Sequence, residues 1–517
     1  MAKPERQPRA SEKPAKPGTP APEEAAAPGR SARSSDGRPP GAEREKKHPK
    51  KSESAMPTGM LGRAGRLAAA SLKSSLRVAF AGPRLLLGRD AGSRLLELHA
   101  GAAQDLLATL GRLKGASMKV GQLASFIDAG VLPEEVRDTY QQVLGSLRDA
   151  APPMKPKLVK EVFKAEFDAE PEELFASFET KPVAAASLGQ VHLASLDDGR
   201  EVAVKIQYPG IEAAVRSDMA MTAAVKPLVP LLAPGLDVHE ALEEMRTRVL
   251  EECDYILEAE SLDTLARHYE GHPFVYVPSS VPERTTRRIL TMERTQGATF
   301  SQIKRLPKAE RDRVGEILFR FYYGSLHRYG FTSADPHPGN YMLMEDGRMA
   351  FFDFGLACNL DPRMSPHMLG GLIALRDHDV DKLFEHGLAM RYVTRAHTDP
   401  QRFFDWVAFS LDPIRADRDY TFKRQFIADR TAAMLDPRNP WWSFIRQLNL
   451  PRWAVLIYRL ELGLFAVLAQ LGATANWHRI TMGFYGDAPP AGELGQAEWQ
   501  WLRDRTRPED GPAAGTP

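Results

Sequence analysis

Three short segments carry side chains whose types and spacing suit the transfer of a phosphoryl group. Lys205 closes an alternating Val-Ala-Val-Lys run, and Asp335 and Asn340 stand five residues apart in a loop with two prolines. Asp353 begins an Asp-Phe-Gly tripeptide directly after an apolar run. This chemistry needs a cation for the nucleotide phosphates, ligands for Mg²⁺ and a carboxylate near the nucleophile. We assign the cation to Lys205 and the catalytic carboxylate to Asp335, which leaves Asn340 and Asp353 as the metal ligands.

The order of these motifs is more informative than any motif alone. In isolation, Lys205 fits a surface lysine on a strand, Asp335 fits the cap of a Pro/Gly turn, and Asp-Phe-Gly is a common tripeptide. Asn340, however, lies thirteen residues before Asp353 with one hairpin between them, as in the catalytic loop and metal-binding segment of protein kinases. The combination predicts a site that binds ATP and Mg²⁺.

Strands and helices must position these residues. Alternation predicts strands at 190–196, 201–207, 274–277 and 288–292, and a hairpin of 341–344 with 349–352. Helical periodicity predicts helices at 95–126, 134–147, 158–167, 240–269 and 311–329, and a helical region at 362–485. The helix at 311–329 has an apolar stripe of Val314, Ile317, Leu318, Phe321 and Tyr322. We therefore expect an α+β, two-lobed fold. Met292 and Glu293, at the end of the strand at 288–292, are further candidate nucleotide-binding residues.

The predicted helix at 240–269 carries several carboxylates, including Glu251, Glu252, Asp254 and Glu258. Spacing of i, i+4 would place Asp254 and Glu258 on one helical face. Clustered carboxylates repel one another, so we expect a lysine or a metal ion among them. Spacing alone does not decide which of them pairs with Lys205.

The segment before the first long strand lacks the glycines of a kinase phosphate loop. Its residues Ala184, Ala185, Ala186 and Ser187 stand at that place. A Cβ on each residue restricts positive φ and the close approach of backbone to phosphate. We therefore expect a nucleotide pose that differs from that of ordinary protein kinases.

These motifs together resemble the UbiB/AarF family of atypical kinases, which includes the eukaryotic coenzyme-Q-biosynthesis kinases. The resemblance covers roughly 61–379 and rests on motifs that together are not features of ordinary kinases. They are Lys119-Val120-Gly121-Gln122, Ala184-Ala185-Ala186-Ser187, Val202-Ala203-Val204-Lys205, Glu252-Cys253-Asp254, Ala334-Asp335-Pro336-His337-Pro338-Gly339-Asn340 and Asp353-Phe354-Gly355.

The resemblance implies more than spacing does. It implies that a helical extension carrying Lys119 and Gln122 folds over the nucleotide site, with Glu252 and Asp254 as its partners. It also implies that Glu258 pairs with Lys205. Members of this family look like ATPases or kinases of small or lipid-linked molecules in quinone and isoprenoid-lipid metabolism, and protein phosphorylation is disfavoured. This chain has Ser333 where many bacterial members have His before Ala-Asp-Pro.

Composition sets outer limits on partners and location. The formal net charge of +1 gives no reason to expect nucleic-acid binding, and two distant cysteines favour a reducing compartment. No signal-peptide pattern is found at the N-terminus, and the apolar stretch 453–475 is broken by Arg459 and Glu461, which favours a buried helix over a membrane span. We expect a cytoplasmic protein. Peripheral attachment through the basic helix at 60–81, lipid contact and a homodimer stay open.

The expected organisation has five parts. They are a disordered tail at 1–55, a helical extension at 56–151, a kinase core at 152–380 with its N-lobe at about 152–295, a C-terminal helical region at 381–490 and a tail at 491–517. Two alternatives to a lipid-supporting kinase or ATPase remain, namely a Ser/Thr protein kinase and a nucleotide-gated, lipid-binding scaffold with little turnover.

Overall fold

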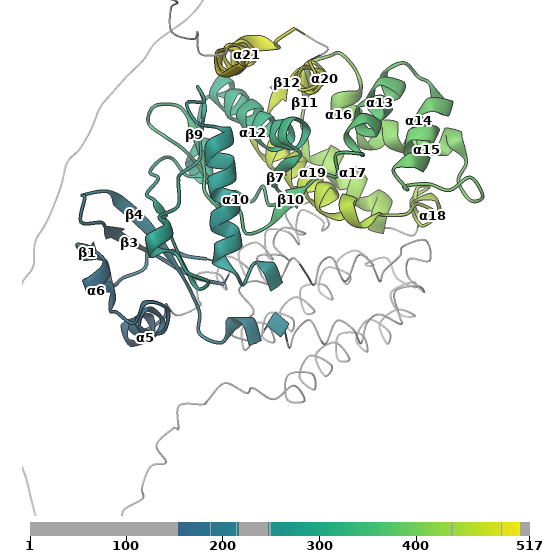
Figure 1. Ribbon diagram of the computed structural model, residues 1–517. Coiled ribbons are helices and arrows are strands. Elements are labelled where there is room, and N and C mark those ends of the chain that lie inside the picture. The colour runs from purple at the N-terminus through teal and green to yellow at the C-terminus, as the bar shows by residue number, and fades with distance from the viewer. Residues whose placement is uncertain are drawn as a thin grey trace, which may run out of the picture. The chain divides into compact units, whose positions relative to one another are not determined.

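The computed structural model of the chain describes residues 153–186, 188–213, 215–216, 247, 250–435, 438–486 and 489–506. The helices expected at 60–81, 95–126 and 134–147, together with Lys119, Gln122 and Ser187, lie outside the described residues. The other predicted elements can be followed along the chain in Figure 1.

An antiparallel sheet carries Lys205. The hairpin of β3 (Gly189–Ser195) and β4 (Glu201–Gln207) is its centre, and β6 (Ile289–Glu293) pairs with β4. The short strands β1 (Ser177–Phe178) and β2 (Ala184–Ala185) both pair with β3. The strands predicted at 190–196, 201–207 and 288–292 are confirmed within one residue at each end, and β-branched residues alternate along β4 and β6.

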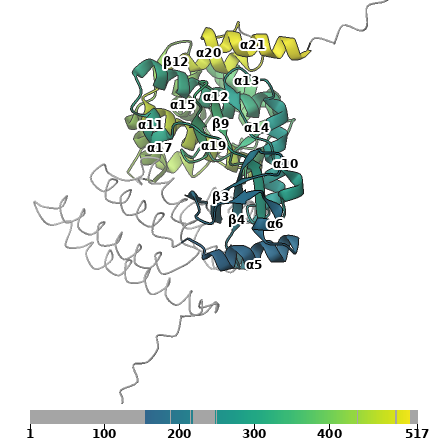
Figure 2. The ribbon, with the colours of Figure 1, turned by 90° about the vertical axis from the view of Figure 1, so that its left-hand side faces the viewer.

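One face of the β3–β4 hairpin is buried, and the opposite face, which carries Lys205, is partly buried. Val202, Val204 and Ile206 face a core shared with α5 (Pro156–Phe167), which lies beside β3 and β4 (Figure 2). The alternate residues of β4 face the other way, so that Ala203 packs against the main core and Lys205 is 6% exposed. The alternation of side chains along the strand therefore directs the side chain of Lys205 toward the helix that follows in the chain.

Helix α10 (Tyr255–His268) is shorter than predicted. Residues 252–253 form a turn, and Asp254 is the N-cap, with its side chain accepting from Ile256 N at 3.1 Å. The expectation that one continuous helix spans 240–269 is therefore wrong at 252–254. Aspartate is a preferred N-cap residue, because its side chain accepts a hydrogen bond from a backbone N–H group in the first turn of a helix. A new helix therefore begins after Asp254.

The loop that carries Asp335 and Asn340 comes shortly after α12 (Lys308–Tyr329), whose predicted apolar stripe is fully buried. The antiparallel pairs β7 (Phe331–Ser333) with β10 (Ala357–Asn359) and β8 (Tyr341–Leu343) with β9 (Met349–Phe351) frame the loops. Strand β5 (Val275–Tyr276) lies parallel to β9. Residues 334–340 join β7 to β8, and residues 352–356 join β9 to β10, so each loop runs between the same two strand pairs.

The remaining chain is helical, as predicted for 362–485. Its longer helices are α13 (Ser365–Arg376), α14 (Val380–Ala389), α15 (Pro400–Ser410), α17 (Arg424–Leu435), α19 (Arg452–Leu471) and α20 (Trp477–Gly483). Shorter elements elsewhere are α6 (Pro171–Leu174), η3 (Pro282–Arg284), α11 (Phe300–Ile303), α16 (Asp412–Arg415), α18 (Trp442–Ile445), β11 (Tyr420–Thr421) and β12 (Thr474–Ala475). Helices α13, α14 and α15 lie together (Figure 1).

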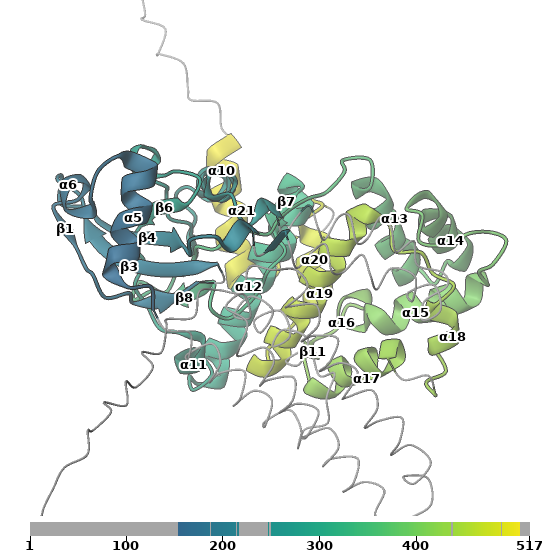
Figure 3. The same cartoon turned by 90° about the horizontal axis from the view of Figure 1, so that it is seen from below.

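Helix α19 packs along α12 in the main core (Figure 3). Within the described residues it alone is long and apolar enough to cross a membrane, and 61% of its most apolar window is buried. Leu460, Leu464 and Leu468 are fully buried, which confirms the predicted buried helix. The two charges that interrupt it have partners, since Arg459 pairs with Asp335 and Glu461 with Arg430.

The expectation of a tail at 491–517 is corrected for 492–506, which form α21 (Gly492–Thr506). Glu498 of this helix is 1% exposed and pairs with Arg320 and Arg328 of α12. The composition of the segment is polar, and its anchors lie more than 160 residues away in sequence, so no local pattern shows this docking.

Candidate active site

The lysine, glutamate and aspartate at the centre of the site come from three separate elements. Strand β4 carries Lys205, α10 carries Glu258, and Asp353 follows β9. Lys205 Nζ donates to Glu258 Oε1 at 2.7 Å and to Oε2 at 2.9 Å. The same ammonium lies 3.5 Å from Asp353 Oδ2. The fold thus brings together the strand lysine, its helix partner and the expected metal-binding aspartate.

Exposure differs among the three side chains. The side chains alone are 8% exposed for Lys205 and 3% for Glu258, whereas the side chain of Asp353 is 33% exposed. Burial works against a charged lysine, but the carboxylates of Asp353 and Glu258 outweigh it and raise the pKa of Lys205 well above its ordinary value. The Tyr255 ring, 4.9 Å from Nζ, adds a cation–π contact. Lys205 is therefore a fixed cation, while Asp353 keeps an exposed face.

Asp335 is held from two sides. Arg459 Nη2 of α19 donates to Asp335 Oδ1 at 2.9 Å. Asn340 Nδ2 donates to Asp335 Oδ2 at 3.1 Å and to the backbone oxygen of Asp335 at 3.0 Å. Both bonds use the amide nitrogen of Asn340, so its Oδ1 keeps its lone pairs for another partner. The loop carboxylate therefore has a fixed orientation.

Ser333, the last residue of β7, links the two aspartates of the site. The backbone N of Asp335 donates to Ser333 Oγ at 3.3 Å, and Ser333 Oγ donates to the backbone oxygen of Asp353 at 3.5 Å. His337 supports the same loop, because its Nδ1 accepts from Gly339 N at 3.0 Å.

Helix α19 supplies site residues that sequence reasoning missed. Arg459 was interpreted only as a charge that interrupts an apolar stretch. Gly463 lies one turn further on the same helical face, and a Cβ at this position would lie 2.8 Å from Pro336 Cγ. The sequence signal for this face was a charge inside an apolar helix, since such a charge needs a partner when buried.

Glu252 lies half-buried in the turn before α10. Burial, then the carboxylates of Asp335 and Asp353, raise the pKa of Glu252 to about 8, against the opposing effect of Arg459 and Lys205. The neutral acid therefore predominates at pH 7. This coupling places Glu252 within electrostatic reach of both aspartates, and its role at the nucleotide site remains a prediction.

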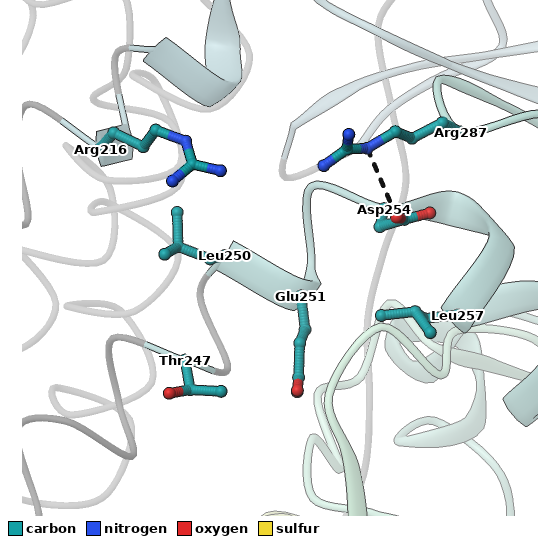
Figure 4. A pocket seen from close by; sticks show the side chains of 7 residues that line it. All are labelled: Arg216, Thr247, Leu250, Glu251, Asp254, Leu257 and Arg287. Carbon is teal, nitrogen blue, oxygen red and sulfur yellow. Dashed lines mark ion pairs between the residues drawn. The ribbon is translucent and has the colours of Figure 1, made fainter.

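Asp254 does not share the face of Glu258, and the i, i+4 argument for this pair is wrong. Besides capping α10, Asp254 Oδ2 lies 3.4 Å from Arg287 Nε. Both residues line a pocket of about 350 Å³ with Glu251 and Leu257, while none of Lys205, Glu258, Asp335 and Asp353 lines it (Figure 4). The direct contact of Asp254 with a nucleotide remains a prediction.

The alanine-rich segment forms a tight hairpin. Ala184 and Ala185 are exposed and pair with β3, and Ala186 N donates to Gly189 O at 2.9 Å to close the turn. A Cβ on Gly189 would lie 2.0 Å from Ile206 O, so this position requires glycine. The contacts predicted between these alanines and a nucleotide stay predictions.

Met292 and Glu293 end the strand that borders β4. Met292 is 7% exposed and pairs with Ala203 of β4. Glu293 Oε2 accepts from Tyr276 Oη at 2.8 Å and from Ser279 N at 3.0 Å, which fixes the end of the strand. Their role in nucleotide binding also remains a prediction.

The donor set suits Mg²⁺ held together with a nucleotide. Asp353 offers a partly exposed carboxylate and Asn340 an amide oxygen with no hydrogen bond in the described residues. No group of three or more His, Cys, Asp or Glu residues in the described ranges could hold a metal ion. Mg²⁺ commonly takes one or two protein oxygens and completes its octahedron with phosphates and water. The two oxygens fit that pattern.

The sheet, the Lys205–Glu258 pair, the Asp335–Asn340 loop and the Asp353 segment together define a protein-kinase-like fold with two lobes. A solved structure described as the complex of Rv3197 with erythromycin from Mycobacterium tuberculosis is similar, with a TM-score of 0.55 and 31% identity. That match covers 77% of this chain and 99% of the other. Residues 146–387 match the model of the ABC1 atypical kinase-like domain, and the chain belongs to this family.

Curated relatives lie in the same family. The chain is 29% identical over 381 residues to the mitochondrial atypical kinase COQ8 of Saccharomyces cerevisiae, covering 71% of this chain and 72% of that one. It is 28% identical over 374 residues to the mitochondrial atypical kinase COQ8B of Rattus norvegicus, covering 72% of this chain and 69% of that one. The resemblance inferred from the motifs is confirmed by these matches.

Proposed function

We propose that the chain binds Mg²⁺–ATP and transfers its terminal phosphoryl group to water or to a small, lipid-related molecule. The observation that carries this proposal is the contact of Lys205 with both Glu258 and Asp353. Such a lysine–glutamate pair beside the metal-binding aspartate is the arrangement that an active kinase needs. A scaffold would require neither this pair nor the fixed carboxylate of Asp335.

Each residue has a defined part in the proposed reaction. Lys205 holds the nucleotide phosphates as a point charge, and Glu258 keeps the ammonium in place. Asn340 Oδ1 and the Asp353 carboxylate would hold Mg²⁺, which supplies charge neutralisation on the phosphates when bound. Asp335 accepts from Arg459 and Asn340, so its carboxylate orients the attacking hydroxyl group or water from a fixed position.

The acceptor is proposed from the family and from the expected cover over the site. The motif at 119–122 and the alanines at 184–186 stand where the family departs from protein kinases, which disfavours a protein acceptor. The relatives named COQ8 and COQ8B are atypical kinases, and the family resemblance includes coenzyme-Q biosynthesis. We therefore propose support of isoprenoid-quinone or related lipid metabolism, with lipid contact or peripheral membrane attachment as part of it.

The acceptor can be tested by following the γ-phosphoryl group. Labelled ATP is incubated with the full chain, with Mg²⁺ or with EDTA, in the presence of detergent-dispersed isoprenoid lipid or of a generic protein substrate. We expect Mg²⁺-dependent release of phosphate or label in the lipid fraction. The asparagine variant Asp353→Asn serves as the inactive control. Label in the protein substrate at a higher rate than in water or lipid would contradict the proposal and favour a Ser/Thr protein kinase.

A further inference from the structure

The C-terminal helix α21 is anchored to α12 by a buried ionic cluster. Glu498 Oε2 accepts from Arg320 Nη1 at 2.9 Å, and Arg328 reaches both carboxylate oxygens at 2.5 and 2.8 Å. Glu498 and Arg320 are 1% and 4% exposed. Burial alone would raise the pKa of Glu498, but the bonds from Arg328 and His272 hold it well below its ordinary value. The helix therefore docks through a cluster in which Glu498 and both arginines are charged.

The same face of α21 also caps the end of α10. Arg505 Nη1 and Nη2 donate to the backbone oxygens of His268 and Arg267 at 2.6 and 3.1 Å. Trp501 Nε1 donates to Glu270 O at 3.1 Å, and the Trp501 ring stacks on Tyr269 with an interplanar angle of 5°. The carbonyls of Arg267 and His268 are among those that a helix leaves without internal partners at its C-terminus, and Glu270 lies just beyond the helix. Helix α21 therefore joins α12 to α10 (Figure 3).

Helix α10 carries Glu258 near its first turn and meets α21 at its last turn. Ten residues separate Glu258 from His268, so the two sites lie about 15 Å apart along one rigid helix. Lys205, by contrast, is fixed in β4. A shift of α10 relative to the rest of the fold changes the distance between the Glu258 carboxylate and the Lys205 ammonium. In kinases the position of this helix decides whether the ion pair forms.

We propose that α21 is a built-in positioning element, in which Trp501 and Arg505 hold α10 so that Glu258 reaches Lys205. The inference rests on the proposed function, because it assigns to α21 an effect on nucleotide binding and turnover. Trp501 and Arg505 are positioning residues and touch no group of the site themselves.

The test compares the full chain with variants that remove one contact at a time. Trp501→Ala and Arg505→Ala remove contacts to the C-terminal end of α10, and Trp501→Ala also removes a ring contact with His272, while the bonds of Arg320 and Arg328 to Glu498 stay in place. Trp499→Ala is the matched control, because this tryptophan is 46% exposed and stacks only with Arg503 of its own helix among the described contacts. Mg²⁺–ATP affinity and turnover are measured for each variant, alone and combined with Glu258→Gln.

We expect Trp501→Ala with Arg505→Ala to lower turnover about tenfold, whereas Trp499→Ala leaves it unchanged. In the Glu258→Gln background the same double substitution should change turnover less than about twofold, because its effect acts through Glu258. An equal loss in both backgrounds would assign α21 to general stability and overturn the inference. Unchanged turnover in the Trp501/Arg505 variant would also overturn it.

Hydrogen exchange across 255–268 separates this inference from the proposed function. We expect faster exchange of α10 amides in the Trp501/Arg505 variant than in Trp499→Ala, whether or not the chain turns over ATP. If the wild-type chain binds no Mg²⁺–ATP, the proposed function fails and the exchange data still decide whether α21 holds α10. Equal exchange in both variants would refute the positioning role.

Discussion

At the level of single residues, the surroundings of Asp335 decide what its carboxylate can do. Arg459 and Asn340 each donate a hydrogen bond to one carboxylate oxygen of Asp335, so the carboxylate group is not free to rotate. Glu252 adds a third carboxyl group near Asp335 and Asp353, and the negative charges of these two aspartates favour its protonated form. The cations Lys205 and Arg459 oppose this effect, and bound Mg²⁺ would oppose it further.

Replacing Arg459 should lower activity more than stability. In Arg459→Ala the Asp335 carboxylate loses a charged partner and its orientation, and we expect turnover to fall about tenfold to a hundredfold. Arg479→Ala is the matched control, because this arginine forms an exposed pair with Asp417 at 2.7 Å and lies on another helix. Steady-state phosphate release measures both variants. Equal rates for Arg459→Ala and the control would refute a role at Asp335.

The raised pKa of Glu252 predicts a stability difference that depends on pH. The folded state favours the protonated acid, because the pKa of Glu252 rises from 4.5 to about 8 on folding. The wild-type chain therefore loses stability relative to Glu252→Gln as the pH rises from about 4.5 to about 8. Urea unfolding in EDTA should show similar stabilities at pH 4.5 and an advantage for the variant at pH 8, of up to about 4 kcal/mol for a shift of this size. A constant difference at both pH values would contradict this assignment.

At the level of helices and strands, the sequence predicted the structure wherever it carried a local periodicity or motif. The strand carrying Lys205, the hairpin before Asp353 and the stripe of α12 were predicted, since alternation and helical spacing follow directly from burial. The break at Asp254 was missed because an N-cap aspartate and a mid-helix aspartate look alike in a single sequence. Arg459 and Gly463 were missed as site residues because their partners lie more than 120 residues away.

The face of α19 that meets the catalytic loop should tolerate no side chain at position 463. In Gly463→Ala the new Cβ meets Pro336 Cγ at 2.8 Å, so the loop must shift, at a cost of about 1–3 kcal/mol in stability. We expect turnover to fall with it, because Asp335 adjoins Pro336. Gly483→Ala on α20 is the control, since nothing lies within 4 Å of its added Cβ and alanine favours the helix by up to about 1 kcal/mol. Similar turnover in both variants would contradict the packing argument.

At the level of the whole molecule, one helix at the end of the described chain stabilises contacts between distant elements. Glu498 neutralises two buried arginines of α12, and its depressed pKa means that this stabilisation is present at neutral pH and is lost as the pH falls. The expected tail was wrong here for a physical reason. A polar helix docks through buried ion pairs when its partners are supplied by another element, and no hydrophobic period is needed.

Removing the Glu498 charge should therefore be costly. Glu498→Gln removes the carboxylate that pairs with buried Arg328 and leaves Arg320 with Glu316 as its counter-charge, and we expect a loss of about 3–5 kcal/mol in the free energy of unfolding at pH 7. Glu385→Gln removes a carboxylate from an exposed pair with Arg395, where both side chains are more than half exposed, and should cost less than about 1 kcal/mol. Denaturant unfolding compares the two, and equal losses would argue against a buried ionic anchor.

We propose that Lys205, Glu258 and Asp353 together bind the nucleotide and its metal ion. This can be tested by calorimetric titration of the full chain with ATP, in Mg²⁺ and in EDTA. We expect saturable binding that requires Mg²⁺, a loss of at least about tenfold in affinity in Lys205→Ala, and loss of the Mg²⁺ dependence in Asp353→Asn. Binding of equal affinity and equal Mg²⁺ dependence in all three proteins would contradict it.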